Sequence, residues 1–108
     1  MDPRVTAAIN MMHRQLANRI CMLGLSRNVN LSSSRLRQLF KEDTGRSPMQ
    51  YLQDLRMQNA ERLLRSTFLS VKEVAFVSGI SDVSSFVREF KKRYGQTPGE
   101  FRDQTSGH

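Results

Sequence analysis

Apolar residues recur every three or four positions along most of the chain, which is the spacing of one face of an α-helix. Val5, Ile9 and Met12 follow this spacing near the N-terminus, behind an Asp2-Pro3 pair typical of a helix start. No stretch alternates long enough to predict a strand. The pattern therefore predicts an all-α fold of about seven helices. They cover residues 3–18, 20–29, 32–44, 47–65, 70–78, 82–94 and a short stretch from 97 that contains Phe101.

One stretch of the sequence occurs twice. Residues 34–51 (SRLRQLFKEDTGRSPMQY) return 50 positions later as residues 84–101 (SSFVREFKKRYGQTPGEF), with five identical positions. In each copy a helix with apolar residues four apart is followed by a glycine that ends it. A new helix then starts with a hydroxyl cap, a proline at the first helical position, and Gln50 or Glu100 completing a capping box. Two copies of one helical unit are predicted.

The longest helix, residues 47–65, has no single apolar stripe. At 100° per residue, the apolar residues of its first half, such as Leu52 and Leu55, lie on a different side from Met57 and Leu64 in its second half. One end of the helix is therefore expected to pack in one direction and the other end in another. This pattern predicts a rod that joins two small cores.

Both units contain the elements of a helix-turn-helix. This motif needs a small residue where the second helix crosses the first, a residue that tolerates a tight turn four positions later, and then an apolar anchor. Ala75, Gly79 and Ile80 fit this pattern in the second unit. In the first unit the corresponding residues are serine, asparagine and leucine, and asparagine is the next most tolerant residue after glycine in the left-handed region. These three residues are Ser26, Asn30 and Leu31.

The helix after each turn is predicted to enter the major groove of DNA with the exposed side of its N-terminal half. Arginine suits guanine and glutamine suits adenine, whereas valine can contact a thymine methyl group. The residues predicted to contact bases are Ser34, Arg35, Arg37, Gln38, Val83, Ser84, Ser85 and Arg88. The residues predicted to contact phosphates are Lys41, Arg46, Lys91, Lys92 and Arg93. An ordinary solvated helix face is the alternative reading of each set.

The joining helix of about 18 residues is expected to be roughly 27 Å long. With the width of the flanking units added, this length approaches the ~34 Å of one DNA turn. We therefore expect one chain to place its two reading helices in adjacent major grooves on one side of the duplex, and to bend the DNA if the grooves require it.

The charge agrees with a polyanionic partner. Seventeen basic and ten acidic side chains give a net charge of +7, and the pI is near 10.5. Such a surplus favours nucleic acid or an acidic membrane surface, although a merely basic, solvated surface has the same composition. Thirteen of the basic residues are arginines, which bind phosphates and guanine edges in bidentate fashion.

Little in the sequence favours an enzyme. There is one cysteine, Cys21, and the two histidines are His13 and His108, so neither a catalytic constellation nor a metal-ligand spacing is present. No cofactor is expected. No apolar run approaches ~20 residues, and the N-terminus lacks the layout of a secretion signal. A small protein of the cytoplasm, associated with the nucleoid, is the expectation.

The sequence resembles the DNA-binding domain of the AraC/XylS family of bacterial transcription regulators from Pro3 to about Arg102. The resemblance is carried by LSRNVNLSSSRLRQLFKEDTG-SP--YL, by LR--NA--LL from Leu55 to Leu64, and by VAFVSGISDVSSFVREFKKRYG-TP--FR. The first unit departs from the usual small-residue and glycine pattern at three positions. These are Gly24, Ser26 and Asn30.

The resemblance implies a tandem helix-turn-helix domain that activates transcription, often by also touching RNA polymerase. The family's base-contacting positions fall on Ser34, Arg37, Gln38, Val83, Ser84, Ser85 and Arg88. Most members carry a ligand-sensing or dimerisation domain, usually before this one, so the chain resembles a C-terminal domain or one of the short members.

The alternative function is a helical protein-interaction adaptor without DNA affinity. The expected organisation is a first subdomain (3–46), a linker helix (47–65), a second subdomain (66–103) and a flexible tail (104–108).

Overall fold

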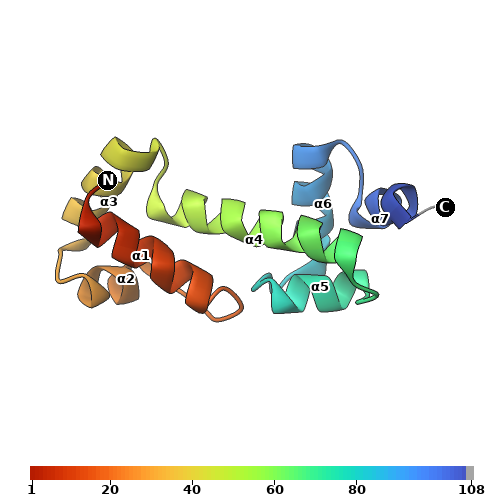
Figure 1. Cartoon of the computed structure of the whole chain (residues 1–108), viewed down its shortest axis with the longest axis horizontal. Coiled ribbons are helices and arrows are strands. Elements are labelled where there is room, and N and C mark those ends of the chain that lie inside the picture. Colours follow the sequence, from red (N-terminus) through yellow and green to blue (C-terminus); the bar gives the residue numbers. More distant parts are fainter. Residues whose placement is uncertain (107–108) are drawn as a thin grey trace. The chain divides into compact units, whose positions relative to one another are not determined.

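A computed structural model describes residues 1–106, and these residues form seven helices and no strand (Figure 1). The all-α prediction is confirmed. The helices are α1 (Pro3–Arg14), α2 (Met22–Asn28), α3 (Ser33–Thr44), α4 (Pro48–Ser66), α5 (Val71–Val77), α6 (Val83–Tyr94) and α7 (Pro98–Ser106).

Two helix ends differ from the prediction by three residues or more, and the others lie within two residues of it. The first helix ends at Arg14 instead of residue 18, because Gln15 leaves helical geometry with φ −119°. Leu16, which the periodicity placed on the helix, packs against the first core from the turn that follows. At the other end of the chain, α7 continues to Ser106, so residues 104–106 of the predicted tail are helical. The rest of that tail, 107–108, lies outside the described residues.

The chain divides into two compact units, one from Met1 to Leu55 and the other from Arg56 onward. Each unit has its own core, formed mainly by fully buried aromatic and aliphatic side chains. The first core contains Val5, Ala8, Met12, Ile20, Leu25, Val29, Leu36, Leu39, Phe40 and Leu52. The second contains Met57, Ala60, Leu64, Val74, Ala75, Phe86 and Phe90.

Helix α4 contributes to both cores, as its two groups of apolar residues predict. Leu52 is buried in the first core, where Tyr51 and Leu55 pack against it. Met57 and Leu64 are buried in the second core. The boundary between the units therefore lies within α4, after Leu55, and not at either end of this helix.

The predicted helix starts are present as hydrogen bonds. Ser47 Oγ accepts from the Gln50 amide at 3.2 Å, while Gln50 Oε1 accepts from the Ser47 amide at 3.0 Å. Thr97 and Glu100 form the same reciprocal pair at 3.2 and 2.9 Å. Ser70 opens α5 with a third capping box. Each box satisfies two amide groups that a helix end leaves without a helical partner, so it fixes where the helix begins.

Candidate nucleic-acid interface

The two tight turns have the backbone that a helix-turn-helix requires. Asn30 and Gly79 both lie in the left-handed region, with φ of 57° and 84°. Asn30 is the only residue other than glycine with a positive φ among the described residues. The anchor after each turn is tied back in the same way: the Leu31 amide donates to the Ser26 carbonyl at 3.0 Å, and the Ile80 amide to the Ala75 carbonyl at 2.8 Å.

The small residues of the two motifs are buried where the second helix passes the first. Ala75 is fully buried and Ser26 is 2% exposed. The Ser26 hydroxyl is compensated, because it donates to the Leu23 carbonyl at 3.1 Å and lies 3.4 Å from the Ser33 hydroxyl. Ser26 therefore takes the place that Ala75 has in the second motif, and its buried hydroxyl still has hydrogen-bond partners.

Helix α3 exposes the face that the sequence predicts. Leu36, Leu39 and Phe40 are buried. Exposed on the opposite side are Ser34, Arg35, Arg37, Gln38 and Lys41. Arg35 donates to Gln38 Oε1 at 3.0 Å, and Gln38 Nε2 donates to Glu42 Oε1 at 3.3 Å. The predicted base-reading side chains of α3 are thus exposed and partly linked to one another.

Helix α6 differs in how far its predicted side chains protrude. Ser84 and Arg88 are exposed, whereas Val83 and Ser85 are half-buried. Val83 packs partly against the second core, so only part of its side chain is available outside.

A chain of hydrogen bonds runs along the start of α6. Asp82 Oδ1 accepts from the Ser84 amide at 3.0 Å and caps the helix. Its other oxygen accepts from the Ser85 hydroxyl at 2.7 Å, and Ser85 Oγ accepts from Arg88 at 3.2 Å. The bond from the Ser85 hydroxyl, followed by backbone donors and by Arg88, holds the pKa of Asp82 below its ordinary value.

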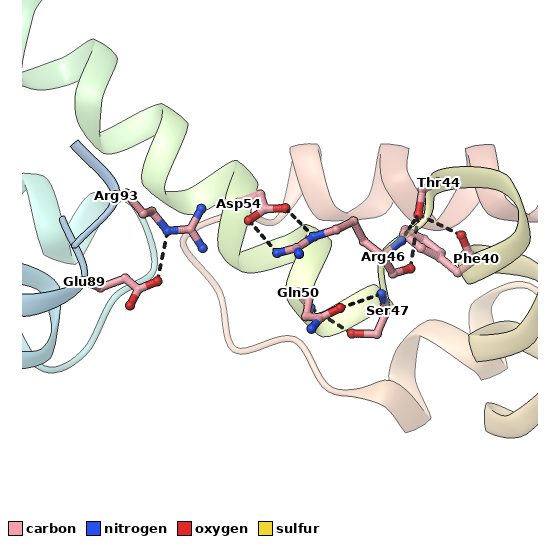
Figure 2. Close-up of polar contacts among 8 residues, drawn as sticks. All are labelled: Phe40, Thr44, Arg46, Ser47, Gln50, Asp54, Glu89 and Arg93. Carbon is pink, nitrogen blue, oxygen red and sulfur yellow. Dashed lines mark hydrogen bonds and ion pairs between the residues drawn. The ribbon is translucent and has the colours of Figure 1, made fainter. Parts of the chain in front are cut away.

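The five residues predicted to contact phosphates are all exposed. They are Lys41, Arg46, Lys91, Lys92 and Arg93. Two of the arginines have acidic partners (Figure 2): Arg46 contacts the two carboxylate oxygens of Asp54 at 3.0 and 3.1 Å, and Arg93 contacts Glu89 at 3.0 Å. A phosphate would compete with these carboxylates for the guanidinium groups.

Sequence reasoning assigned no role to Asp82. It carries a negative charge at the start of a predicted DNA-reading helix, and it is linked to the side chains of two residues predicted to contact bases, directly to Ser85 and through it to Arg88. A signal was present in the sequence, because aspartate, serine and arginine follow one another at intervals of three and therefore lie on one side of a helix.

Residues 1–106 contain no group of three or more metal-ligating side chains. None of the helices in this part of the chain has the length and apolar character needed to cross a membrane.

Comparison with known proteins agrees with this geometry. Residues 25–104 match the family model of a helix-turn-helix domain. The chain belongs to the AraC/XylS family. The match covers both helix-turn-helix motifs, from Leu25 in α2 to Gln104 in α7. The family consists of DNA-binding transcription regulators and not of enzymes, as the sequence led us to expect.

Curated relatives are regulators of greater length. The chain is 30% identical over 92 residues to the Msm operon regulatory protein of Streptococcus mutans, covering 85% of this chain and 33% of the relative. It is 31% identical over 101 residues to the transcriptional activator RhaR of Mannheimia succiniciproducens, covering 94% of this chain and 37% of the relative. The chain thus spans about a third of the length of these relatives.

Solved structures share the fold over nearly the whole chain. The C-terminal domain of the response regulator yesN from Fusobacterium nucleatum has a TM-score of 0.86 at 31% identity, with 94% of this chain and 99% of that chain covered. The DNA-binding domain of AdpA, solved in complex with a target DNA, has a TM-score of 0.89 at 25% identity, with 96% and 93% covered.

Proposed function

We propose that the chain binds double-stranded DNA in a sequence-specific manner, with the N-terminal halves of α3 and α6 in adjacent major grooves. The observation that carries this proposal is the repetition of one motif. Both units have a left-handed turn residue, a buried small residue and a following helix whose polar face is exposed in the same register. An ordinary solvated helix face does not require the same turn, buried small residue and exposed polar face in both units. The DNA-binding domain of AdpA, which has the same fold, was solved with DNA bound.

The two helices offer different groups to base edges. On α3, Arg35 and Arg37 are suited to guanine and Gln38 to adenine. On α6, Arg88 is suited to guanine. Serine hydroxyls can donate a hydrogen bond to an acceptor, or accept one from a donor, on the edge of any base. The serines on this face are Ser84 and Ser85, and Ser34 is the corresponding serine of α3. The exposed part of Val83 is available to a thymine methyl group.

Phosphate contacts are assigned to the basic residues at the far end of each reading helix and in the loop after α3. These are Lys41, Arg46, Lys91, Lys92 and Arg93. They would position the protein on the duplex and make its affinity dependent on salt, because each neutralised phosphate releases counterions. Arg46 and Arg93 would exchange a carboxylate partner for a phosphate oxygen.

We propose further that DNA binding regulates transcription, by activation, in the bacterial cytoplasm at the nucleoid. The names of the relatives support regulation, since they include operon regulatory proteins and one activator. RNA polymerase is the partner proposed for activation. Because the relatives are about three times as long as the matched region, a sensor or dimerisation domain preceding this one is proposed for the full-length protein.

The test is selection of binding sites from a random duplex library with the purified chain, followed by a salt titration on the recovered site. We expect two short boxes about 10 base pairs apart, which is one turn of DNA. We also expect affinity to fall steeply as salt rises. One box alone would contradict the use of adjacent grooves, and no affinity for DNA would favour the adaptor function.

A further inference from the structure

The two reading helices are capped by different chemistry. Ser32 caps α3 with a neutral hydroxyl that accepts from the Arg35 amide at 3.1 Å. Asp82 caps α6 with a carboxylate. A serine is as good a helix cap as an aspartate. The start of α6 therefore does not need a negative charge for capping, and on a DNA-binding face that charge repels phosphates.

The carboxylate of Asp82 fixes the direction of a neighbouring hydroxyl group, that of Ser85. A carboxylate accepts hydrogen bonds and cannot donate them, so the single proton of the Ser85 hydroxyl must point toward Asp82. The lone pairs of Ser85 Oγ are then left for Arg88, which donates to them at 3.2 Å. In this way the direction of the hydroxyl and the position of the guanidinium are set from the start of the helix.

Helix α3 has no equivalent relay. Arg35 and Gln38 occupy the positions that correspond to Ser85 and Arg88, and Arg35 donates directly to Gln38 at 3.0 Å. The hydroxyl of Ser32 accepts from the backbone amide of Arg35. The first unit thus supplies a built-in comparison for the second.

We propose that Asp82 is a positioning residue for sequence reading, which acts through the Ser85 hydroxyl to hold Arg88 over the exposed face of α6. An arginine side chain loses considerable rotamer freedom when it is fixed on a base. Holding Arg88 before DNA arrives reduces that loss and favours the base that matches its position. The positioning role in DNA reading rests on the proposed function, whereas the ordering of Arg88 is a property of the free protein.

The first experiment measures the free protein. Asp82→Asn retains a good helix cap and an acceptor for the Ser84 amide, but replaces one carboxylate oxygen by an amide that donates. Nitrogen relaxation of the Arg88 Nε–H group is expected to show greater side-chain mobility in this variant and in Ser85→Ala. Ser32→Asn, the same new cap on α3, should leave Arg88 unchanged. Unaltered mobility of Arg88 in both α6 variants would overturn the proposal.

The second experiment measures DNA preference. The ratio of affinities for the selected duplex and for one with the Arg88-dependent base pair replaced should fall roughly 2- to 10-fold in Asp82→Asn, which is the range expected for one hydrogen bond. Affinity for random duplex should hold or rise, since a negative charge is removed. Loss of a merely structural cap would instead weaken binding to all duplexes together.

A double variant tests whether Asp82 affects DNA preference through Arg88. If Asp82 acts through Arg88, then Asp82→Asn added to Arg88→Ala should change the preference no further. Independent, additive losses would overturn the proposal. Failure of the proposed function is recognised separately, because the unaltered chain would then prefer no duplex, while the mobility of Arg88 would still report on the relay.

Discussion

The two helix-turn-helix units share a backbone and differ in where they place charge. In α3 the basic side chains Arg35 and Arg37 lie in the half that is proposed to read bases, and the last turn contains one basic residue, Lys41, followed by Glu42 and Asp43. In α6 the reading half carries Arg88 as its one basic residue, and the last turn carries three consecutive basic residues. Helix α3 thus has two cations proposed to lie near the bases, whereas α6 has one there and three more placed for phosphates, where they also complement the helix dipole.

The same comparison applies to the loop that follows each reading helix. Arg46 and Asp54 form an ion pair across eight residues in the first unit. At the corresponding positions of the second unit, Gln96 donates to Gln104 at 3.0 Å. Because an exposed ion pair contributes little to stability, an amide pair replaces it at small cost. The connection between loop and helix is retained while its chemistry changes, so the repeat preserves geometry more strictly than charge.

The largest expected effect concerns the turns. Gly79→Val places a branched side chain at φ 84°, a region that such residues almost never adopt. We expect the second unit to lose about 1–3 kcal/mol of stability, the usual cost of such a strained backbone. Thermal unfolding followed by nuclear magnetic resonance, with signals from each unit, measures this loss.

Two variants sharpen this test. Gly99→Val in α7, where an added side-chain carbon meets nothing within 4 Å, should cost less than Gly79→Val, although both lie in the second unit. Asn30→Val should strain the first unit in the same way, since Asn30 has φ 57°. If Gly79→Val melted like the unaltered chain, the turn would not require glycine.

The next effect concerns DNA reading. Arg37→Ala and Arg88→Ala should each cost ~1–3 kcal/mol of binding free energy on the selected site, because each removes a contact that distinguishes one base pair. Arg93→Ala serves as the control. It should weaken binding to selected and random duplexes alike. The slope of log affinity against log salt concentration should decrease by the amount expected for about one neutralised phosphate. Equal losses on random duplex for Arg37→Ala or Arg88→Ala would reassign those residues to phosphates.

The features that the sequence predicted well depend on neighbours within four residues. Ser32 caps α3 and Gly45, at φ 76°, ends it, because capping and left-handed geometry are local properties of the chain. The left-handed turn at Asn30 was predicted for the same reason. The two cores followed from the periodicity of α4, where Leu52 and Met57 point to different sides.

The features that the sequence could not predict depend on packing and on rotamers. The half-burial of Val83 is set by how closely α6 approaches the second core, which periodicity does not give. The tail was predicted to begin at residue 104, yet α7 continues to Ser106, and Arg102 within it hydrogen-bonds the carbonyls of Leu64, Thr67 and Leu69 and thereby anchors the helix. The relay from Asp82 to Arg88 requires particular rotamers.

A smaller effect is expected in α2, which is capped by the thiol of Cys21. Gly24→Ala should stabilise the first unit by up to about 1 kcal/mol, because alanine loses less conformational entropy in a helix. The added carbon would lie 3.7 Å from Cys21 Sγ, an ordinary van der Waals contact. The melting temperature of the first unit measures this gain. A decrease would mean that the hydrogen bond from the Gly24 amide to Cys21 is disturbed.

The smallest expected difference is in acid sensitivity, and it arises from the charged caps of the second unit. The pKa values of Glu73, Asp82 and Glu100 are all lowered, mainly by hydrogen bonds from Ser70, Ser85 and Thr97 respectively. A carboxyl whose pKa is lowered by folding stabilises the protein above its unfolded pKa, and this stabilisation is lost as the pH falls through the folded value. In the first unit the pKa of Asp2 is lowered, chiefly by the side chain of Arg4, whereas the caps at Ser32 and Gln50 do not carry a charge.

We therefore expect the second unit to lose more stability than the first as the pH falls below about 4, where carboxyl groups protonate. Resonances assigned to each unit, followed from pH 6 to pH 2, measure the difference. Glu100→Gln gives the second unit the neutral capping box that Gln50 provides in the first, and it should reduce the acid sensitivity of α7. If the first unit unfolded at the higher pH, or if Glu100→Gln left the acid transition of the second unit in place, the charged caps would not be its cause.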